Sequence, residues 1–322
     1  MSADEPTSTP RTVVVTGASS GLGYFAAEQL AAAGHRVVLA CRSADRSETA
    51  ARSIRERVLG ADLAQVRVDL ADLDSVRAGA AALRALGPID ALVNNAGVVG
   101  SSAYQATAQG FELQFGTNHL GHFAWTALLL PMLEETAGRV VHLGSISHRW
   151  AWLDRTDPTA SRPYVNYLQY ARSKLAVMLF GFELAQRLAD AGSRVSSVVA
   201  HPGLAIDALT PERPDIVPVS GTPAWVAAGE QLWAQGKDTG AHPLVYAAVG
   251  DDVHSGEYWG PGGWMQLRGQ PVVVPAKPRA HDRTVAARLW AASERCTGVS
   301  LDLPTTAMSA ALRRIDRDDD HL

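Results

Sequence analysis

The chain has 322 residues, of which 47% are hydrophobic and 19% are charged, and its formal net charge is -4. This composition is typical of a globular protein with a sizeable core, and it offers no basic surface for nucleic acid or acidic lipid. The two cysteines, Cys41 and Cys296, are too few for a disulfide framework or a zinc site, which favours a reducing compartment.

The ends of the chain and its apolar runs favour a cytoplasmic protein without a membrane span. Residues 1–10 are polar and contain proline, unlike a signal peptide, and we expect a disordered tail there. The longest apolar run, residues 123–133, falls short of the ~20 residues that span a bilayer. Residues 301–322 are expected to form an extension with an acidic, solvated tail.

Short β-branched runs alternate with longer segments of helical period from residue 12 to residue 200. The expected strands are residues 12–16, 36–40, 65–69, 89–95, 138–145 and 194–200, and long helices are expected from about Leu22 and over 111–133 and 170–192. Continuously apolar strands separated by helices imply a parallel sheet covered on both faces. The predicted fold is α/β, a Rossmann-type doubly wound parallel sheet in a single domain over residues 11–300, with an irregular C-terminal part beyond Pro202.

A glycine-rich segment, "TGASSGLG", follows the first expected strand. Gly17, Gly21 and Gly23 let the turn tighten and let backbone N–H groups and a helix N-terminus approach a pyrophosphate. The alternative is a purely structural glycine-rich turn. The position of this segment after the first strand of a βαβ unit favours a dinucleotide site over that alternative.

The ends of the next two strands bear on the choice of dinucleotide. The second strand ends in Cys41 and Arg42, with no carboxylate until Asp45, which favours the 2′-phosphate of NADP(H) over NAD(H). Arg42 could instead be a solvated surface residue. After the third strand, Asp69 could meet the adenine amino group or cap the following helix.

Tyr170 and Lys174 lie four residues apart on an expected helix, so their side chains share a face. A nearby ammonium favours the phenolate and lowers the pKa of a tyrosine, which can then exchange a proton with a carbonyl or alcohol oxygen. Tyr164 and Tyr167 have no lysine at that offset, and we interpret them as packing or pocket-rim residues.

Ser145 stands at the end of the strand before this helix, where its hydroxyl could stabilise a developing oxyanion. Ser147 lies two residues further on. A turn-forming role is the alternative for either serine.

Taken together, these motifs resemble the short-chain dehydrogenase/reductase family over about residues 11–204. The matching segments are TGASSGLG at 16–23, DL at 69–70, NNAG at 94–97, the asparagine of FGTNHLG, Ser145, YARSK at 170–174 and HPG at 201–203. The TGxxxGxG spacing is that of the family's short reductases. The segments "ACR", "GFELQFGTNHLGHF" and "LWAASERCTG" are similar to the branch of retinol dehydrogenases, WW-domain oxidoreductases and protochlorophyllide reductases.

The resemblance implies a role for each matching residue. Tyr170 is the implied acid/base, Lys174 lowers its pKa and binds the nicotinamide ribose, Ser145 hydrogen-bonds the substrate oxygen, and Asn118 holds a water that links Lys174 to solvent. Asn95 is implied to tie neighbouring strands together near the cofactor. The implied cofactor-binding residues, besides Tyr170 and Lys174, are Gly17, Ser19, Ser20, Gly21, Leu22, Gly23, Arg42, Asp69, Leu70, Asn95, Ala96, Gly97, Pro202 and Gly203.

Two features depart from the family pattern. The segment after Pro-Gly usually reads PGxxxT, but here Asp207 stands at the threonine position. Either this carboxylate turns away from the cofactor phosphates, with Thr210 filling in, or cofactor binding is altered. The second departure is the long insertion between Ser145 and Tyr170, which relatives in the retinol dehydrogenase branch also carry.

Tryptophans are frequent in the expected loops: Trp150, Trp152, Trp225, Trp233, Trp259 and Trp264. With a substrate lid at about residues 204–240, as the resemblance implies, they favour a bulky apolar or aromatic substrate; packing of the C-terminal part is the alternative. His119, His122, His142 and His148 are too scattered for a metal site, so no metal is expected.

The function predicted from the sequence is NADP(H)-dependent hydride transfer between nicotinamide and a small-molecule carbonyl or alcohol, within secondary metabolism. The alternative is a non-redox protein of the same fold, namely an epimerase, a dehydratase or an NADP-sensing interaction protein. Light-driven reduction of protochlorophyllide is a third hypothesis. No nucleic-acid partner is expected, and the resemblance allows a homo-oligomer.

Overall fold

The strands form one twisted sheet in the computed structural model, which describes residues 9–154, 157, 159, 164–217, 229–301 and 303. Within these residues the sheet has eight strands in the order β3-β2-β1-β4-β5-β6-β7-β8. The first seven are parallel, and β8 pairs antiparallel with β7. Their bounds are β1 Thr12–Thr16, β2 Arg36–Cys41, β3 Leu63–Arg67, β4 Ala91–Asn94, β5 Arg139–Leu143, β6 Ser196–Ala200, β7 Tyr258–Pro261 and β8 Pro271–Val273.

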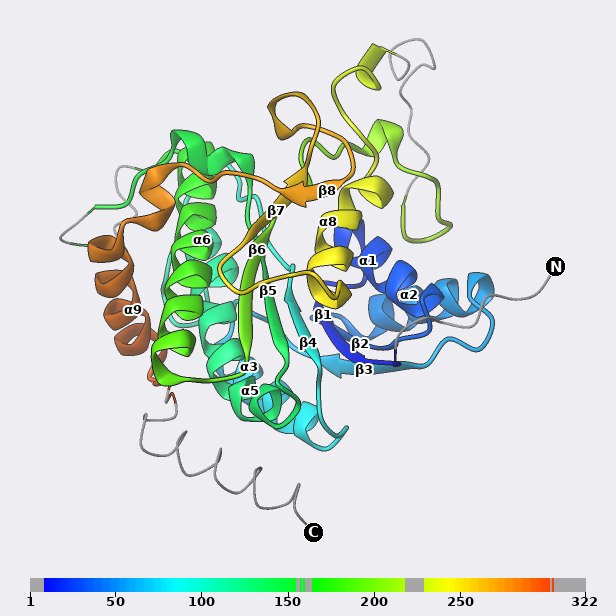
Figure 1. The fold of residues 1–322 in the computed structure, drawn as a ribbon, viewed down its shortest axis with the longest axis horizontal. Coiled ribbons are helices and arrows are strands. Elements are labelled where there is room, and N and C mark those ends of the chain that lie inside the picture. Colours follow the sequence, from blue (N-terminus) through cyan, green and yellow to red (C-terminus); the bar gives the residue numbers. More distant parts are fainter. Residues whose placement is uncertain are drawn as a thin grey trace.

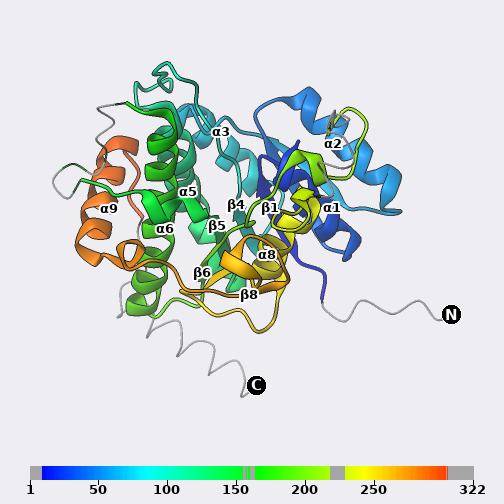
Figure 2. The ribbon, with the colours of Figure 1, turned by 90° about the horizontal axis from the view of Figure 1, so that it is seen from above.

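Helices cover both faces of this sheet (Figures 1 and 2). One face carries α1 (Gly21–Ala32), α2 (Ala44–Arg57) and α8 (Lys237–Val249). The other carries α3 (Leu73–Arg84), α5 (His122–Thr136) and α6 (Asn166–Ala191), with α9 (Arg283–Thr297) packed outside α6. Short helical segments complete the chain: α4 Leu113–Phe115, η1 Gly116–Gly121, η2 Ile146–Trp150, η3 Asp207–Leu209, η4 Trp264–Gln266 and η5 Pro278–His281.

The strand order confirms the predicted Rossmann-type doubly wound α/β fold. The central strands are buried on both faces, as their continuous apolar runs predict. The chain passes from β1 into α1 on one face, whereas it passes from β4 to α5 on the other. Ligands bind outside the carboxyl ends of strands at such a switch point, so the crevice beyond β1 and β4 is where a site is expected.

The long helix expected over residues 111–133 is present but contains a π turn. The structure has α4, the π-helical turn η1 and then α5 without a break, and the sequence analysis did not predict the π turn. The π turn packs tightly, because a Cβ on Gly121 would lie against the carbonyl oxygen of Leu70 and one on Gly116 would lie against Thr107. Single π turns often occur at functional sites, and this one contains Asn118.

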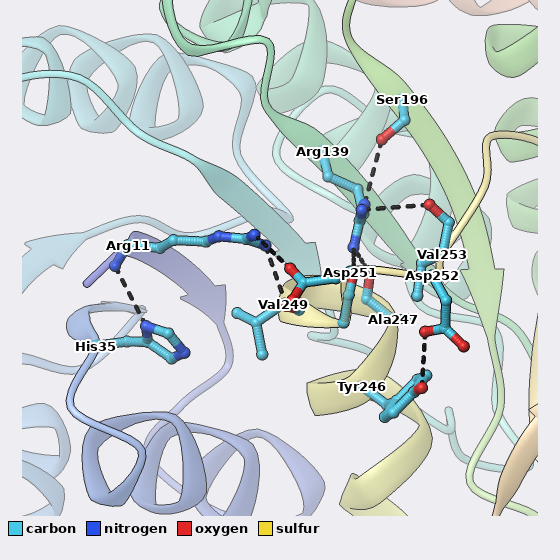
Figure 3. A network of polar contacts seen from close by, with 11 residues as sticks. Arg11, His35, Arg139, Ser196, Tyr246, Ala247, Val249, Asp251, Asp252 and Val253 are labelled. Carbon is cyan, nitrogen blue, oxygen red and sulfur yellow. Dashed lines mark hydrogen bonds and ion pairs between the residues drawn. The ribbon is translucent and has the colours of Figure 1, made fainter. Parts of the chain in front are cut away.

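Two arginines tie the end of α8 and the residues after it to strands that lie far away in sequence (Figure 3). Arg139, at the start of β5, donates to the carbonyl oxygens of Ala247 and Gly250, both at 3.0 Å. Arg11 donates to the carbonyl oxygen of Val249 at 3.1 Å and pairs with Asp251. The C-terminal part is therefore fixed to the sheet, although its sequence is irregular.

Trp259 is not a loop residue, which corrects the expectation from the sequence. It lies in β7, is 5% exposed and packs in the core, with its ring 4.9 Å from that of Tyr246. Residues 1–8, 302 and 304–322 lie outside the described residues, and so do residues 218–228 of the expected lid, which include Trp225. Among the helices that the structure describes, none has the length and apolar character to cross a membrane.

Candidate active site

The glycine-rich turn between β1 and α1 leaves room that any side chain would fill. Gly17 and Gly21 have φ values of 69° and 57°, in the left-handed region that favours glycine. A Cβ on Gly23 would lie 2.5 Å from the carbonyl oxygen of Gly17 and closer still to the amide of Asn95. Because the helix N-terminus approaches the strand end this closely, the turn has the shape that a dinucleotide cradle requires.

The strand ends next to this turn are tied by Thr16 and Asn95. The Asn95 amide donates to the carbonyl oxygen of Thr16 at 2.8 Å. The backbone N–H groups of Asn95 and Ala96 both donate to the Thr16 hydroxyl, at 2.9 and 3.0 Å. Asn95 thus joins the ends of β1 and β4, the tie that the family resemblance implies.

The remaining residues expected at the cofactor surround the same strand ends. Ser20 is the N-cap of α1 and makes no side-chain capping bond, while Ser19 hydrogen-bonds the buried thiol of Cys41. Arg42 is exposed at the end of β2. Leu22 lies against the start of α8. Beyond β6, Pro202 accepts a hydrogen bond from Gln235 at 2.8 Å, and Gly203 has a φ of 65°.

Asp69 does not cap the following helix, so that alternative is wrong. Asp72 is the N-cap of α3 and accepts a hydrogen bond from the N–H of Asp74. Asp69 instead accepts from the N–H of Ala71 at 3.0 Å in its own turn beyond β3. Leu70, the next residue, is buried against Gly121. A contact between Asp69 and adenine stays a prediction.

Tyr170 and Ser145 are brought together although the insertion separates them in sequence. Burial raises the pKa of the Tyr170 phenol above its ordinary value, and the nearby Ser145 hydroxyl lowers it in part. The Ser145 oxygen also accepts from the N–H and the hydroxyl of Ser147, at 3.1 and 3.0 Å. Because these donors occupy its lone pairs, its own proton is free for Tyr170. Ser145 therefore both shapes the turn and reaches the phenol.

Lys174 is buried, with 3% of its surface exposed. Its ammonium donates to the carbonyl oxygen of Leu143 at 2.9 Å and lies 5.9 Å from the centre of the Tyr170 ring. Burial lowers the pKa of Lys174 to about 8. The Lys174 charge is not among the causes that shift the Tyr170 pKa, so the lowering of that pKa by Lys174 stays a prediction.

Asn118 is held in the π turn by several contacts. Its side chain accepts from the N–H of Val98 at 2.8 Å and donates to the Ser173 hydroxyl at 2.9 Å. Ser173 in turn donates to the carbonyl oxygen of Tyr170 at 2.8 Å. A Cβ on Gly97 would lie 3.3 Å from the Asn118 amide oxygen and 3.6 Å from the Lys174 ammonium. The structure thus gathers Gly97, Asn118, Tyr170 and Lys174.

Two buried histidines, whose part in the site the sequence did not reveal, hold the backbone of this cluster. His122 lies between the carbonyl oxygen of Asn118 and the Thr16 hydroxyl, 2.9 Å from each. His148 Nε2 accepts from the N–H of Lys277 at 3.2 Å, so its Nδ1–H donates to the carbonyl oxygen of Ser145 at 2.6 Å. Burial lowers the pKa of both rings, that of His122 to about 4, and keeps them neutral. The only sequence signal was their nearness to Asn118 and Ser145.

Asp207 forms an ion pair with Lys237, at the start of α8. Thr210 contacts the backbone of the same lysine. Its hydroxyl donates to the carbonyl oxygen of Ile206 at 2.7 Å and accepts from the N–H of Lys237 at 2.9 Å. The carboxylate at the threonine position is therefore neutralised by a lysine.

The other aromatic residues divide between packing and exposure. Tyr164 packs edge-on against Tyr104 and donates to the carbonyl oxygen of Ser101 at 3.0 Å. Tyr167 is exposed, and its ring centre lies 6.5 Å from that of Tyr170. Large exposed aromatic side chains also occur at Trp150, Trp152, Trp233 and Trp264.

The chain belongs to the short chain dehydrogenase family, which matches residues 11–211. It is 37% identical to human retinol dehydrogenase 13, an alignment that covers 90% of this chain and 85% of that protein. Mouse retinol dehydrogenase 14 is also 37% identical, with 90% and 86% covered. These similarities identify an oxidoreductase of the retinol dehydrogenase type, acting on an alcohol or carbonyl group, and support a nicotinamide cofactor.

Solved structures show the same fold. An uncharacterized protein from Mycobacterium paratuberculosis is 36% identical and superposes with a TM-score of 0.73, covering 94% of this chain and all of that one. L-sorbose reductase from Gluconobacter frateurii, solved with NADPH and L-sorbose, is 23% identical with a TM-score of 0.60, covering 78% of this chain and 94% of that one.

Proposed function

We propose that the protein is an NADP(H)-dependent carbonyl reductase or alcohol dehydrogenase in which Tyr170 is the general acid/base. The observation that carries this proposal is the convergence of the Tyr170 phenol and the Ser145 hydroxyl, with buried Lys174 and Asn118 beside them. The glycine-rich turn, where Gly23 leaves space that a Cβ would fill, fits a dinucleotide.

Tyr170 and Ser145 meet the reacting oxygen of the substrate. Burial keeps the phenol protonated at neutral pH, so in the reductive direction Tyr170 donates its proton to the carbonyl oxygen. The bound nicotinamide supplies the hydride. Ser145 stabilises the negative charge that develops on the oxygen. In the oxidative direction the same phenol oxygen takes the proton back from the alcohol.

Lys174 and Asn118 return a proton to the Tyr170 phenol after it has protonated the substrate. With a pKa of about 8, the Lys174 ammonium can release a proton near neutral pH more readily than an exposed lysine. Asn118 lies against the same Gly97 backbone as Lys174 and is fixed by Val98 and Ser173. This placement suits a proton path from solvent through Lys174 to Tyr170.

The finer specificity rests on Arg42 and on the aromatic side chains. Arg42 is exposed just beyond β2, and an arginine after the second strand favours the 2′-phosphate of NADP(H). The exposed tryptophans, and relatives named for retinol, a bulky apolar alcohol, support a bulky apolar or aromatic substrate. Cys41 and Cys296 are free thiols, consistent with a reducing compartment such as the cytoplasm.

The test is a screen of the purified protein for NADPH oxidation with ketones and aldehydes, including retinal, and for NADP reduction with the matching alcohols. NADH and NAD are run in parallel. We expect turnover of apolar carbonyl compounds with a preference for NADPH, and loss of that preference in Arg42→Ala. Absence of turnover across the panel, in a protein that binds the cofactor, would contradict the assignment.

A further inference from the structure

The ion pair between Asp207 and Lys237 joins two segments that meet beside the glycine-rich turn. Asp207 follows β6 and is 67% exposed, while Lys237 is the first residue of α8 and is 26% exposed. A partly exposed ion pair of this kind contributes little to stability, about 1 kcal/mol or less. Stability is therefore a poor reason for its placement.

Lys237 lies over the N-terminus of α1. Its Cδ is 4.0 Å from the position that a Cβ on Gly21 would occupy. The first turn of α8 packs against the first turn of α1, because a Cβ on Gly240 would lie 3.2 Å from Leu22 Cδ2. The Gln29 amide donates to the carbonyl oxygen of Asp238 at 2.8 Å and fastens the two helices together. The lysine stem therefore covers the part of α1 that would face a cofactor diphosphate.

The backbone of Lys237 is also anchored from the other side. Its N–H donates to the Thr210 hydroxyl, which donates to the carbonyl oxygen of Ile206. Gln235 donates through its side chain to the carbonyl oxygen of Pro202, at 2.8 Å. The backbone of Lys237 is thus fixed by hydrogen bonds. Only the side-chain torsions of Lys237 have to change for its ammonium to exchange partners.

We propose that Lys237 binds the diphosphate of the dinucleotide cofactor and that Asp207 is its counter-ion in the free protein. The inference rests on the proposed function, because it requires a dinucleotide at the glycine-rich turn. A lone carboxylate at position 207 would repel a diphosphate, whereas an ammonium is a point charge well suited to phosphate oxygens. Of the three lysines in the chain, Lys174 is buried near Tyr170 and Lys277 follows β8, whereas Lys237 lies beside the glycine-rich turn.

The test measures dissociation constants of NADPH and NADH for the purified full chain, free of cofactor, from the quenching of its tryptophan fluorescence. We expect Lys237→Met to weaken both cofactors equally, by about tenfold. Lys237→Arg keeps the charge and should stay within about threefold of wild type. Arg42→Ala is the matched control, because it should weaken NADPH but not NADH.

Asp207→Asn should strengthen cofactor binding, the opposite of the effect expected for Lys237→Met. Without the carboxylate, the cofactor diphosphate no longer competes with Asp207 for the Lys237 ammonium. Both cofactors should therefore bind a few-fold more tightly, and the gain in affinity should shrink at high salt. Wild-type affinities in Lys237→Met, or weaker binding in Asp207→Asn, would overturn the proposal while leaving the function intact. Failure of the wild-type protein to bind either cofactor would overturn both.

Discussion

Replacing Lys174 by methionine should change how stability depends on pH. The pKa of Lys174 falls from an ordinary 10.5 to about 8 in the folded protein because the ammonium is desolvated. Between those pH values the unfolded chain binds more protons than the folded one, so stability rises with pH through this window. A pKa difference of this size corresponds to about 3 kcal/mol in all, with a slope of about 1 kcal/mol per pH unit near pH 9.

Lys174→Met removes this proton linkage and leaves the other titrating groups in place. Urea unfolding of both proteins at pH 7, 8, 9 and 9.5 measures the difference directly. Relative to the variant, the wild type should gain about 1 kcal/mol between pH 8 and 9. Lys277→Met, which replaces an exposed lysine, serves as the control and should follow the wild type. Parallel stability curves for wild type and Lys174→Met would refute the burial argument.

Two further substitutions test the cradle and the support of Ser145. Gly23→Ala should destabilise the fold by about 1–3 kcal/mol, because its Cβ would press on the backbone at Gly17 and on Asn95. Gly229→Ala is the control. A Cβ there meets nothing within 4 Å, so this substitution should change stability by less than about 0.5 kcal/mol. Equal denaturation midpoints would argue against the close approach. His148→Phe removes the hydrogen bond to the Ser145 carbonyl and should lower kcat by about tenfold to a hundredfold with cofactor affinity unchanged. Unaltered kcat in a variant that loses only stability would make His148 purely structural.

The local and periodic features of the molecule could be predicted from the sequence. Continuous apolar runs predict buried parallel strands, and the glycines of the β1 to α1 turn predict a close approach that the structure shows at Gly23. The Tyr170 and Lys174 pair follows from helical spacing alone. These features depend on neighbours along the chain, which is why their patterns are visible in the sequence.

Contacts between distant segments could not be predicted. The π turn that holds Asn118 depends on Gly121 packing against Leu70, and no helical period shows such a contact. The pairing of Asp207 with Lys237 neutralises the carboxylate at the usual threonine position, but only the fold brings the two residues together. His148 likewise reaches Ser145 and Lys277 at once, which sequence spacing does not reveal.

The most direct test of the central claim compares Tyr170→Phe with Tyr167→Phe in the reduction of one accepted carbonyl substrate by NADPH. Both substitutions remove a phenol oxygen from α6, but only the Tyr170 phenol lies beside the Ser145 hydroxyl. Tyr170→Phe should lower kcat by about a hundredfold or more while it still binds NADPH, and Tyr167→Phe should stay within a few-fold of wild type. Wild-type turnover by Tyr170→Phe would contradict its role as the general acid/base.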